Sequence, residues 1–101
     1  MQFVIIARDG MDAEAPARRH AVRPTHLEAI RPLVEQGHVA VGGSILDEEG
    51  TMTGSVLIVD FPTRQELDAW LSVDPYVANG VWKDIEVHPY RAAVGAWLPD
   101  A

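Results

Sequence analysis

Two runs of consecutive apolar residues constrain the fold of this chain more than any other feature. Phe3–Ala7 and Val56–Val59 are continuously apolar and rich in β-branched side chains, a pattern typical of strands buried on both faces. The fold must therefore place these two strands where both sides of a sheet are covered.

Helical periodicity appears after the first run. Leu27, Ile30 and Val34 recur at helical spacing and mark the expected buried face of a first helix. Because a residue before proline is disfavoured in helical backbone, we expect this helix to start or bend at Arg23. The polar residues 8–15 before it are expected to form a loop.

Capping and turn signals predict the other elements. Thr63 and Glu66 form a capping box that opens a second helix. Gly42-Gly43 lies inside a strand pattern, which predicts a bulge or a close approach to the backbone. The last strand alternates apolar and polar residues, as an edge strand does. The expected strands and helices, in chain order, cover residues 3–7, 23–36, 38–46, 52–60, 63–72 and 82–88.

A short capped turn is predicted between the second helix and the last strand. Asp74 can cap a helix start, because its carboxylate accepts from free backbone N–H groups. Pro75 fits the first helical position, and Gly80 can supply the left-handed residue that ends the turn. The turn is therefore expected over residues 75–79.

This strand–helix–strand–strand–helix–strand order is the split βαβ of ferredoxin-like folds, an α+β class with a four-stranded antiparallel sheet and two helices on one face. The two apolar runs become its central strands. Two helices cover only one sheet face, and large exposed apolar patches are uncommon on soluble monomers. We therefore expect a homodimer formed through the open sheet face.

Composition narrows the functional classes. The 101 residues are expected to form one domain, residues 1–101, and the net charge of -7 argues against nucleic acid and anionic membranes as partners. With no cysteine, a thiolate site is impossible, and the four histidines lack metal-ligand spacing, so neither a metal nor a cofactor is expected. No signal peptide or bilayer-spanning segment is found, so a cytoplasmic location is expected by default.

His26 is the most interesting candidate for chemistry. It lies beside the apolar stripe of the first helix, so partial burial is expected. A carboxylate from Asp74 would set its tautomer and support proton transfer. From the residues alone, a structural histidine and a simple helix cap remain the alternative.

Several segments together resemble the YciI-like family. They are Phe3–Ala7, Arg23-Pro24-Thr25-His26-Leu27, Gly42-Gly43, Gly54-Ser55, Asp74-Pro75-Tyr76 and Gly80-Val81. The resemblance extends from Met1 to about Arg91 and implies a dimeric α+β barrel, similar to muconolactone isomerases and small barrel monooxygenases. Pro24, Pro32 and a Trp97-bearing tail over residues 91–101, expected to dock on another surface, depart from the family.

The resemblance implies a His26–Asp74 acid–base pair in a cleft, with Arg23, Gly43, Ser55 and Tyr76 as substrate-binding residues. The first hypothesis is a small cofactor-independent enzyme of isomerase or lyase type. Its substrate would be a small organic molecule, such as a cyclic or unsaturated acid. The alternative is a binding or assembly module that holds a small molecule in the same cleft without turnover.

Overall fold

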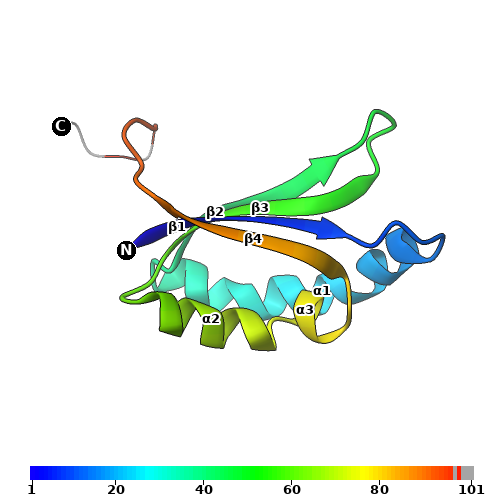
Figure 1. Cartoon of the computed structure of the whole chain (residues 1–101), viewed down its shortest axis with the longest axis horizontal. Coiled ribbons are helices and arrows are strands. Elements are labelled where there is room, and N and C mark those ends of the chain that lie inside the picture. The colour runs from blue at the N-terminus through cyan, green and yellow to red at the C-terminus, as the bar shows by residue number, and fades with distance from the viewer. Residues whose placement is uncertain (97, 99–101) are drawn as a thin grey trace.

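The computed structural model describes residues 1–96 and residue 98, so the predicted docking of Trp97 lies outside the described residues. Its elements, in order, are β1 (Gln2–Asp9), α1 (Ala15–Glu35), β2 (Val39–Leu46), β3 (Met52–Asp60), α2 (Arg64–Val73), α3 (Pro75–Ala78) and β4 (Trp82–Tyr90). The helices form one layer beneath the sheet (Figure 1). The predicted α+β fold, with helices on one sheet face, is confirmed.

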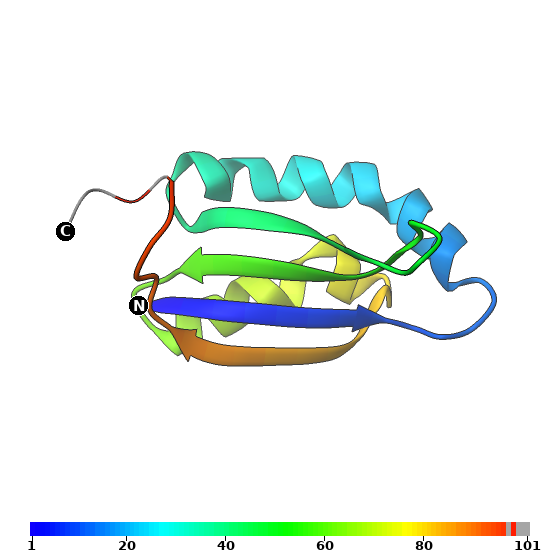
Figure 2. The same cartoon turned by 90° about the horizontal axis from the view of Figure 1, so that it is seen from above.

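The sheet has four strands in the order β2-β3-β1-β4, with every neighbouring pair antiparallel. The two apolar runs therefore lie in the central strands, as predicted. Figure 2 shows α1 along the β2 side of the sheet, with α2 and α3 beneath the middle strands.

The two faces of the sheet differ in how they are covered. On the helix face, Ile5 lies opposite both Leu57 and Val87, and these residues belong to or pack against the core. Val4 and Ile6 point to the other face and stay partly exposed. Within one chain, the central strands are thus covered on one face, and the other face keeps an open apolar area.

The first helix differs from its prediction. It begins at Ala15 and continues through Pro24 and Pro32, because residues on both sides of Pro24 pack into the molecule and offset the lost hydrogen bond. Its buried residues are Ala15, Arg19, His26 and Ile30. The prediction was right for Ile30 and wrong for Leu27 and Val34, which stay more than one-third exposed.

Two further expectations were wrong in detail. The loop expected from residue 8 begins later, since β1 continues to Asp9, whose carboxylate is buried against α1. Of the two alternatives for the glycine pair, the bulge is wrong, because the register shifts lie between Val39 and Val41 and between Ile45 and Leu46. The close approach is present at Gly42, where a Cβ would lie 3.3 Å from the Leu57 side chain.

The predicted caps at Thr63 and Asp74 are confirmed, but among the described residues the reciprocal bond of the capping box, from the Thr63 backbone N–H to the Glu66 side chain, is not formed. Thr63 Oγ1 accepts the backbone N–H of Glu66 at 3.1 Å, which starts α2. Asp74 caps α3 by accepting the backbone N–H of Tyr76 at 2.9 Å. Gly80 has φ 68° and ends this turn in the left-handed region, which glycine adopts without a steric penalty.

Candidate functional site

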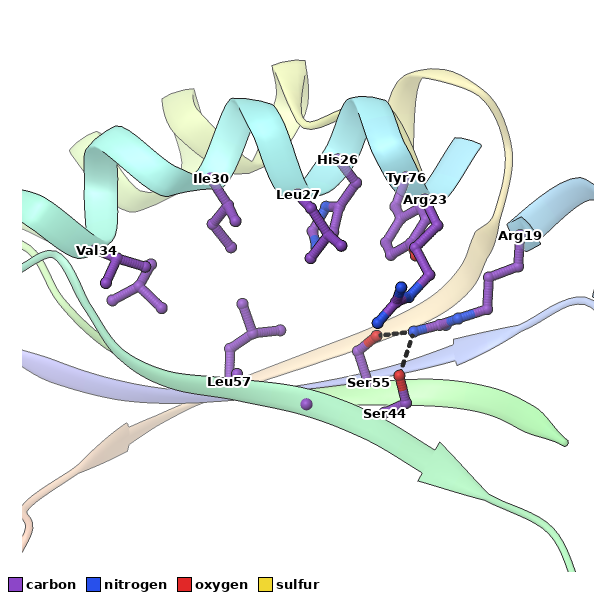
Figure 3. A pocket seen from close by; sticks show the side chains of 13 residues that line it. Arg19, Arg23, His26, Leu27, Ile30, Val34, Ser44, Ser55, Leu57 and Tyr76 are labelled. Carbon is purple, nitrogen blue, oxygen red and sulfur yellow. Dashed lines mark hydrogen bonds between the residues drawn. The ribbon is translucent and has the colours of Figure 1, made fainter. Parts of the chain in front are cut away.

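A cavity of about 300 Å³ opens between α1 and the sheet. One wall is apolar, and the other end carries two arginines and two serines (Figure 3). The lining residues are Arg19, Arg23, His26, Leu27, Ile30, Val34, Val39, Gly42, Gly43, Ser44, Ser55, Leu57 and Tyr76. The arrangement suits a small molecule with an apolar body and a polar or anionic end.

His26 is held in the wall of this cavity by Asp74. Its Nδ1 lies 2.9 Å from Oδ1 and 3.1 Å from Oδ2 of the carboxylate, and both side chains are almost fully buried. An ionised carboxylate only accepts hydrogen bonds, so Nδ1 carries the proton and a neutral ring leaves Nε2 with its lone pair. Within the described part of the chain, Nε2 has no hydrogen-bond partner.

Aromatic rings enclose the imidazole. The ring of Tyr76 stacks on His26 with centroids 3.9 Å apart and an angle of 12°, and Trp82 meets His26 edge-on at 5.7 Å. Burial raises the pKa of the Tyr76 phenol, while the nearby Arg19 and Arg23 oppose this shift. Rings on two sides prevent His26 from turning away from Asp74.

Arg19 organises the polar end of the cavity. It is only 2% exposed, and its Nη1 contacts Asp9 Oδ1 and Oδ2 at 2.9 and 3.1 Å. Its Nη2 donates to Ser55 Oγ at 2.8 Å and to Ser44 Oγ at 3.2 Å. The guanidinium carbon also lies 4.8 Å from the centre of the Tyr76 ring. Arg19 thus connects the end of β1, both serines and the aromatic stack.

The two arginines at the polar end of the cavity differ in whether they have a carboxylate partner. Burial raises the pKa of Asp9, and Arg19 partly offsets that shift through its hydrogen bond and its charge. Because Nη1 of Arg19 lies 2.9 Å from Oδ1 of Asp9, the positive charge of Arg19 has a carboxylate partner within the protein. Arg23 is exposed and has no ion-pair partner among residues 1–96 and 98. Its guanidinium remains available to an anionic group in the cavity.

Comparison with known proteins places the chain in a family. The model of the YCII-related domain matches residues 1–91. The chain belongs to the YCII-related family. Among curated YCII relatives, Protein YciI of Escherichia coli O6:H1 is 33% identical over 97 residues, which cover 90% of this chain and 97% of that protein. An uncharacterized protein of Haemophilus influenzae is 34% identical over 97 residues, with the same two coverages.

Solved structures share the fold of this YCII-related protein. The 5-chloro-2-hydroxyhydroquinone dehydrochlorinase of Burkholderia phenoliruptrix, in complex with 2,5-dihydroxybenzoquinone, has a TM-score of 0.79 at 24% identity, covering 92% of this chain and 96% of that chain. Muconolactone isomerase has a TM-score of 0.67 at 18% identity, covering 99% and 98%. At these identities, the similarity establishes only the fold of the YCII-related chain. Its chemistry has to be inferred from the residues of the site.

The site residues predicted from sequence occupy this part of the YCII-related fold. Arg23, His26, Ser55 and Tyr76 line the cavity, and Asp74 lies behind His26. Gly43 lines it as well, but a Cβ added there would meet no atom within 4 Å. The neighbouring Gly42 is the tighter position, because its Cβ would lie 3.3 Å from the Leu57 side chain.

Arg19, Asp9, Ser44 and Trp82 were missed by sequence reasoning about the YCII-related chain. The available signal was an acid at the end of an apolar strand and an arginine on the next helix, which also fits an ordinary solvated loop. In the described part of the chain, no group of three or more His, Asp or Glu side chains is placed to hold a metal ion, and no helix is long and apolar enough to cross a membrane.

Proposed function

We propose that this YCII-related protein is a small enzyme that transfers a proton on a small organic substrate, with His26 as the general base and acid. The observation that carries the proposal is His26 Nε2, which has no hydrogen-bond partner among residues 1–96 and 98, while the ring lines the cavity and Nδ1 is held by Asp74. The chemistry is assigned to these side chains alone, and isomerisation or elimination is the reaction class that such a pair supports.

Asp74 acts on the reaction through the imidazole. By accepting the Nδ1 proton, its carboxylate selects the tautomer whose Nε2 can take a proton from the substrate. When His26 becomes positively charged, the same carboxylate stabilises the charge. General acid–base catalysis of this kind accelerates a reaction by roughly 10²–10⁴-fold.

The cavity lining indicates the substrate class. Ile30 and Leu57 belong to an apolar wall suited to a ring or an unsaturated chain, and Arg23 offers a cation to a carboxylate or other anionic oxygen. We therefore propose a cyclic or unsaturated acid or a related oxygenated ring. Two proteins of the same fold are, by their names, a dehydrochlorinase and an isomerase of small oxygenated compounds, which fits this class.

A screen for solvent-proton exchange tests the proposal whatever product the reaction yields. Small cyclic and unsaturated acids are incubated with the protein in D₂O, and deuterium incorporation at carbon is followed by NMR. Exchange should occur with the native protein and be lost in His26→Ala. The exposed His20 lies on the same helix outside the cavity, so His20→Ala is the matched control. Exchange that survives in His26→Ala would remove the proposed base.

The second candidate is a module that binds the same compounds without turnover. The cap that Asp74 provides for α3 favours it, because this bond gives the His26–Asp74 pair a structural role whether or not catalysis occurs. Saturable binding of a compound that shows no exchange and no conversion would support this candidate.

We also propose that the protein is a homodimer formed through the open sheet face. Cross-strand register places Val4, Ile6, Val56 and Ile58 together on that face, opposite the helices. These neighbours form an apolar area in the middle of the sheet, while Glu86 and His88 of β4 make one edge polar. A second copy covering the apolar area would bury the face that the central strands leave open.

A further inference from the structure

Ser55 has an unusual set of hydrogen-bond partners. The residue is 4% exposed on β3, and its Oγ lies 2.8 Å from Nη2 of Arg19 and 3.2 Å from Nε1 of Trp82. Both partners are donor-only groups, since neither a guanidinium nor an indole N–H can accept. Ser55 Oγ must therefore accept both bonds.

Within the described part of the chain, this leaves the Ser55 hydroxyl proton without an acceptor. A hydroxyl has one proton and two lone pairs, and both lone pairs are occupied by Arg19 and Trp82. Residues 1–96 and 98 provide no acceptor for the proton, yet Ser55 lines the cavity. The Ser55 proton is therefore available to an acceptor on a molecule that enters the cavity.

Ser44, the other serine at this end of the cavity, differs from Ser55 in where its proton goes. It accepts from the same Nη2 of Arg19 at 3.2 Å, but its own hydroxyl donates to Sδ of Met52 at 3.2 Å. Its proton already has a partner within the protein. The two serines at the polar end of the cavity (Figure 3) therefore differ in what they can offer a ligand.

We propose that Ser55 is a dedicated hydrogen-bond donor to an oxygen of the bound molecule, made so by Arg19 and Trp82. Two donors on the same oxygen polarise its O–H bond, and one of them carries a full charge, which strengthens the bond that Ser55 donates. The ligand must present an acceptor there, such as a carbonyl, carboxylate or enolate oxygen. A ligand group that only donates would face another donor and be rejected.

This assignment rests on the proposed function and deepens it by naming the reacting group. His26 Nε2 takes a proton from a carbon next to a carbonyl; the C–H bond breaks, and its electron pair forms a C=C bond as the carbonyl π pair moves to oxygen. Ser55 donates to that oxygen as it becomes an enolate. Where a β,γ C=C bond conjugates with the enolate, His26 returns the proton to the γ carbon; the double bond shifts to the α,β position and the carbonyl re-forms, which completes an isomerisation. The substrate class is therefore an enolisable carbonyl compound with its oxygen at Ser55.

Ligand binding tests the inference separately from turnover. Benzoate and cyclohexanone, an anionic and a neutral acceptor, are titrated into the native protein, Ser55→Ala, Ser44→Ala and Ser55→Thr. Loss of a hydrogen bond to a ligand oxygen should weaken binding of both probes about tenfold in Ser55→Ala. Ser55→Thr keeps the hydroxyl and should recover most of the affinity, and Ser44→Ala should lose less. Ser72 is exposed on α2, so Ser72→Ala is the control whose affinity for both probes should equal that of the native protein.

Three results of these titrations would contradict the proposed role of Ser55. Unchanged affinity in Ser55→Ala, equal losses in Ser44→Ala and Ser55→Ala, or no binding of either probe by the native protein at millimolar concentration would overturn the inference. Circular dichroism checks the fold, and the nearly isosteric Ser55→Cys, whose thiol is a weak donor, replaces Ser55→Ala if that variant does not fold. Ser55-dependent binding together with exchange that persists in His26→Ala would refute the proposed base and leave the Ser55 assignment standing.

Discussion

His26 Nδ1 lies 2.9 Å from Asp74 Oδ1, the same oxygen that accepts the backbone N–H of the second residue after Asp74. One atom therefore performs a local task, the cap of α3, and a long-range one, the contact with α1. Because the short helix fixes the carboxylate, the imidazole meets a partner that is already oriented. Because Asp74 has these two roles, substitutions of this residue can change the stability of the fold and the proposed proton transfer to different extents.

Replacement of Asp74 should affect stability and proton transfer differently. An asparagine whose amide oxygen takes the place of Oδ1 can still accept both bonds there, but its N–H₂ group replaces Oδ2, which lies 3.1 Å from Nδ1. Asp74→Asn should therefore lose about 1–2 kcal/mol of unfolding free energy. Its exchange rate should fall about 10²-fold, because no charge remains to stabilise protonated His26. Asp74→Ala should lose about 2–4 kcal/mol through the missing cap and the unpaired imidazole.

Urea denaturation and the deuterium-exchange assay measure these two quantities. Asp68, in an exposed pair with Arg64, provides the control Asp68→Ala, which should change neither. Equal stability of Asp74→Ala and the native protein would contradict the buried pair.

Arg19→Met should destabilise the fold by about 3–5 kcal/mol, because it leaves the buried Asp9 carboxylate without its partner. The double variant Arg19→Met/Asp9→Asn removes the stranded charge and should recover part of the loss. A double-mutant cycle by urea denaturation measures the coupling. If the double variant lost as much stability as the two single variants together, Arg19 and Asp9 would have no energetic coupling.

Tyr76 should make the protein sensitive to alkaline pH. Burial raises the pKa of its phenol above the ordinary value of 10.0, so the unfolded chain releases this proton first as the pH rises. Its contribution to stability is thus complete below pH 10.0 and falls above it. Urea denaturation across this range should show a shallower decline in Tyr76→Phe than in the native protein, with Tyr90→Phe as the control. Identical slopes in all three would contradict the assignment.

Val56→Glu should convert the proposed dimer into a monomer, since it places a charge in the middle of the open apolar face. The same substitution at Val73, which is 71% exposed on α2, is the matched control and should remain dimeric. Light scattering coupled to gel filtration gives the mass of each. A native protein that elutes as a monomer at micromolar concentration would refute the dimer.

Local signals were enough to predict much of the fold. The apolar runs in β1 and β3, the capping box at Thr63 and the capped turn after Asp74 each depend on residues close together in the chain. Propensity, capping and alternation act over a few residues, so a sequence displays them directly. The strand order and the edge position of β4 involve distant segments, and they were predicted because the order of the elements and the apolar runs matched the split βαβ topology.

The interior of the site depended on contacts between distant parts of the chain. Leu27 and Val34 have the spacing of core residues, but they line the cavity and stay exposed, whereas Arg19 and His26 on the same helix are buried. The sequence alone determined the order of the elements and the cap at Asp74. Only the tertiary structure decided that Asp9 and Arg19 form a buried pair, and that this pair orients Ser55. A buried charge is stable only beside its partner, and which residues become neighbours is settled by packing, not by sequence spacing.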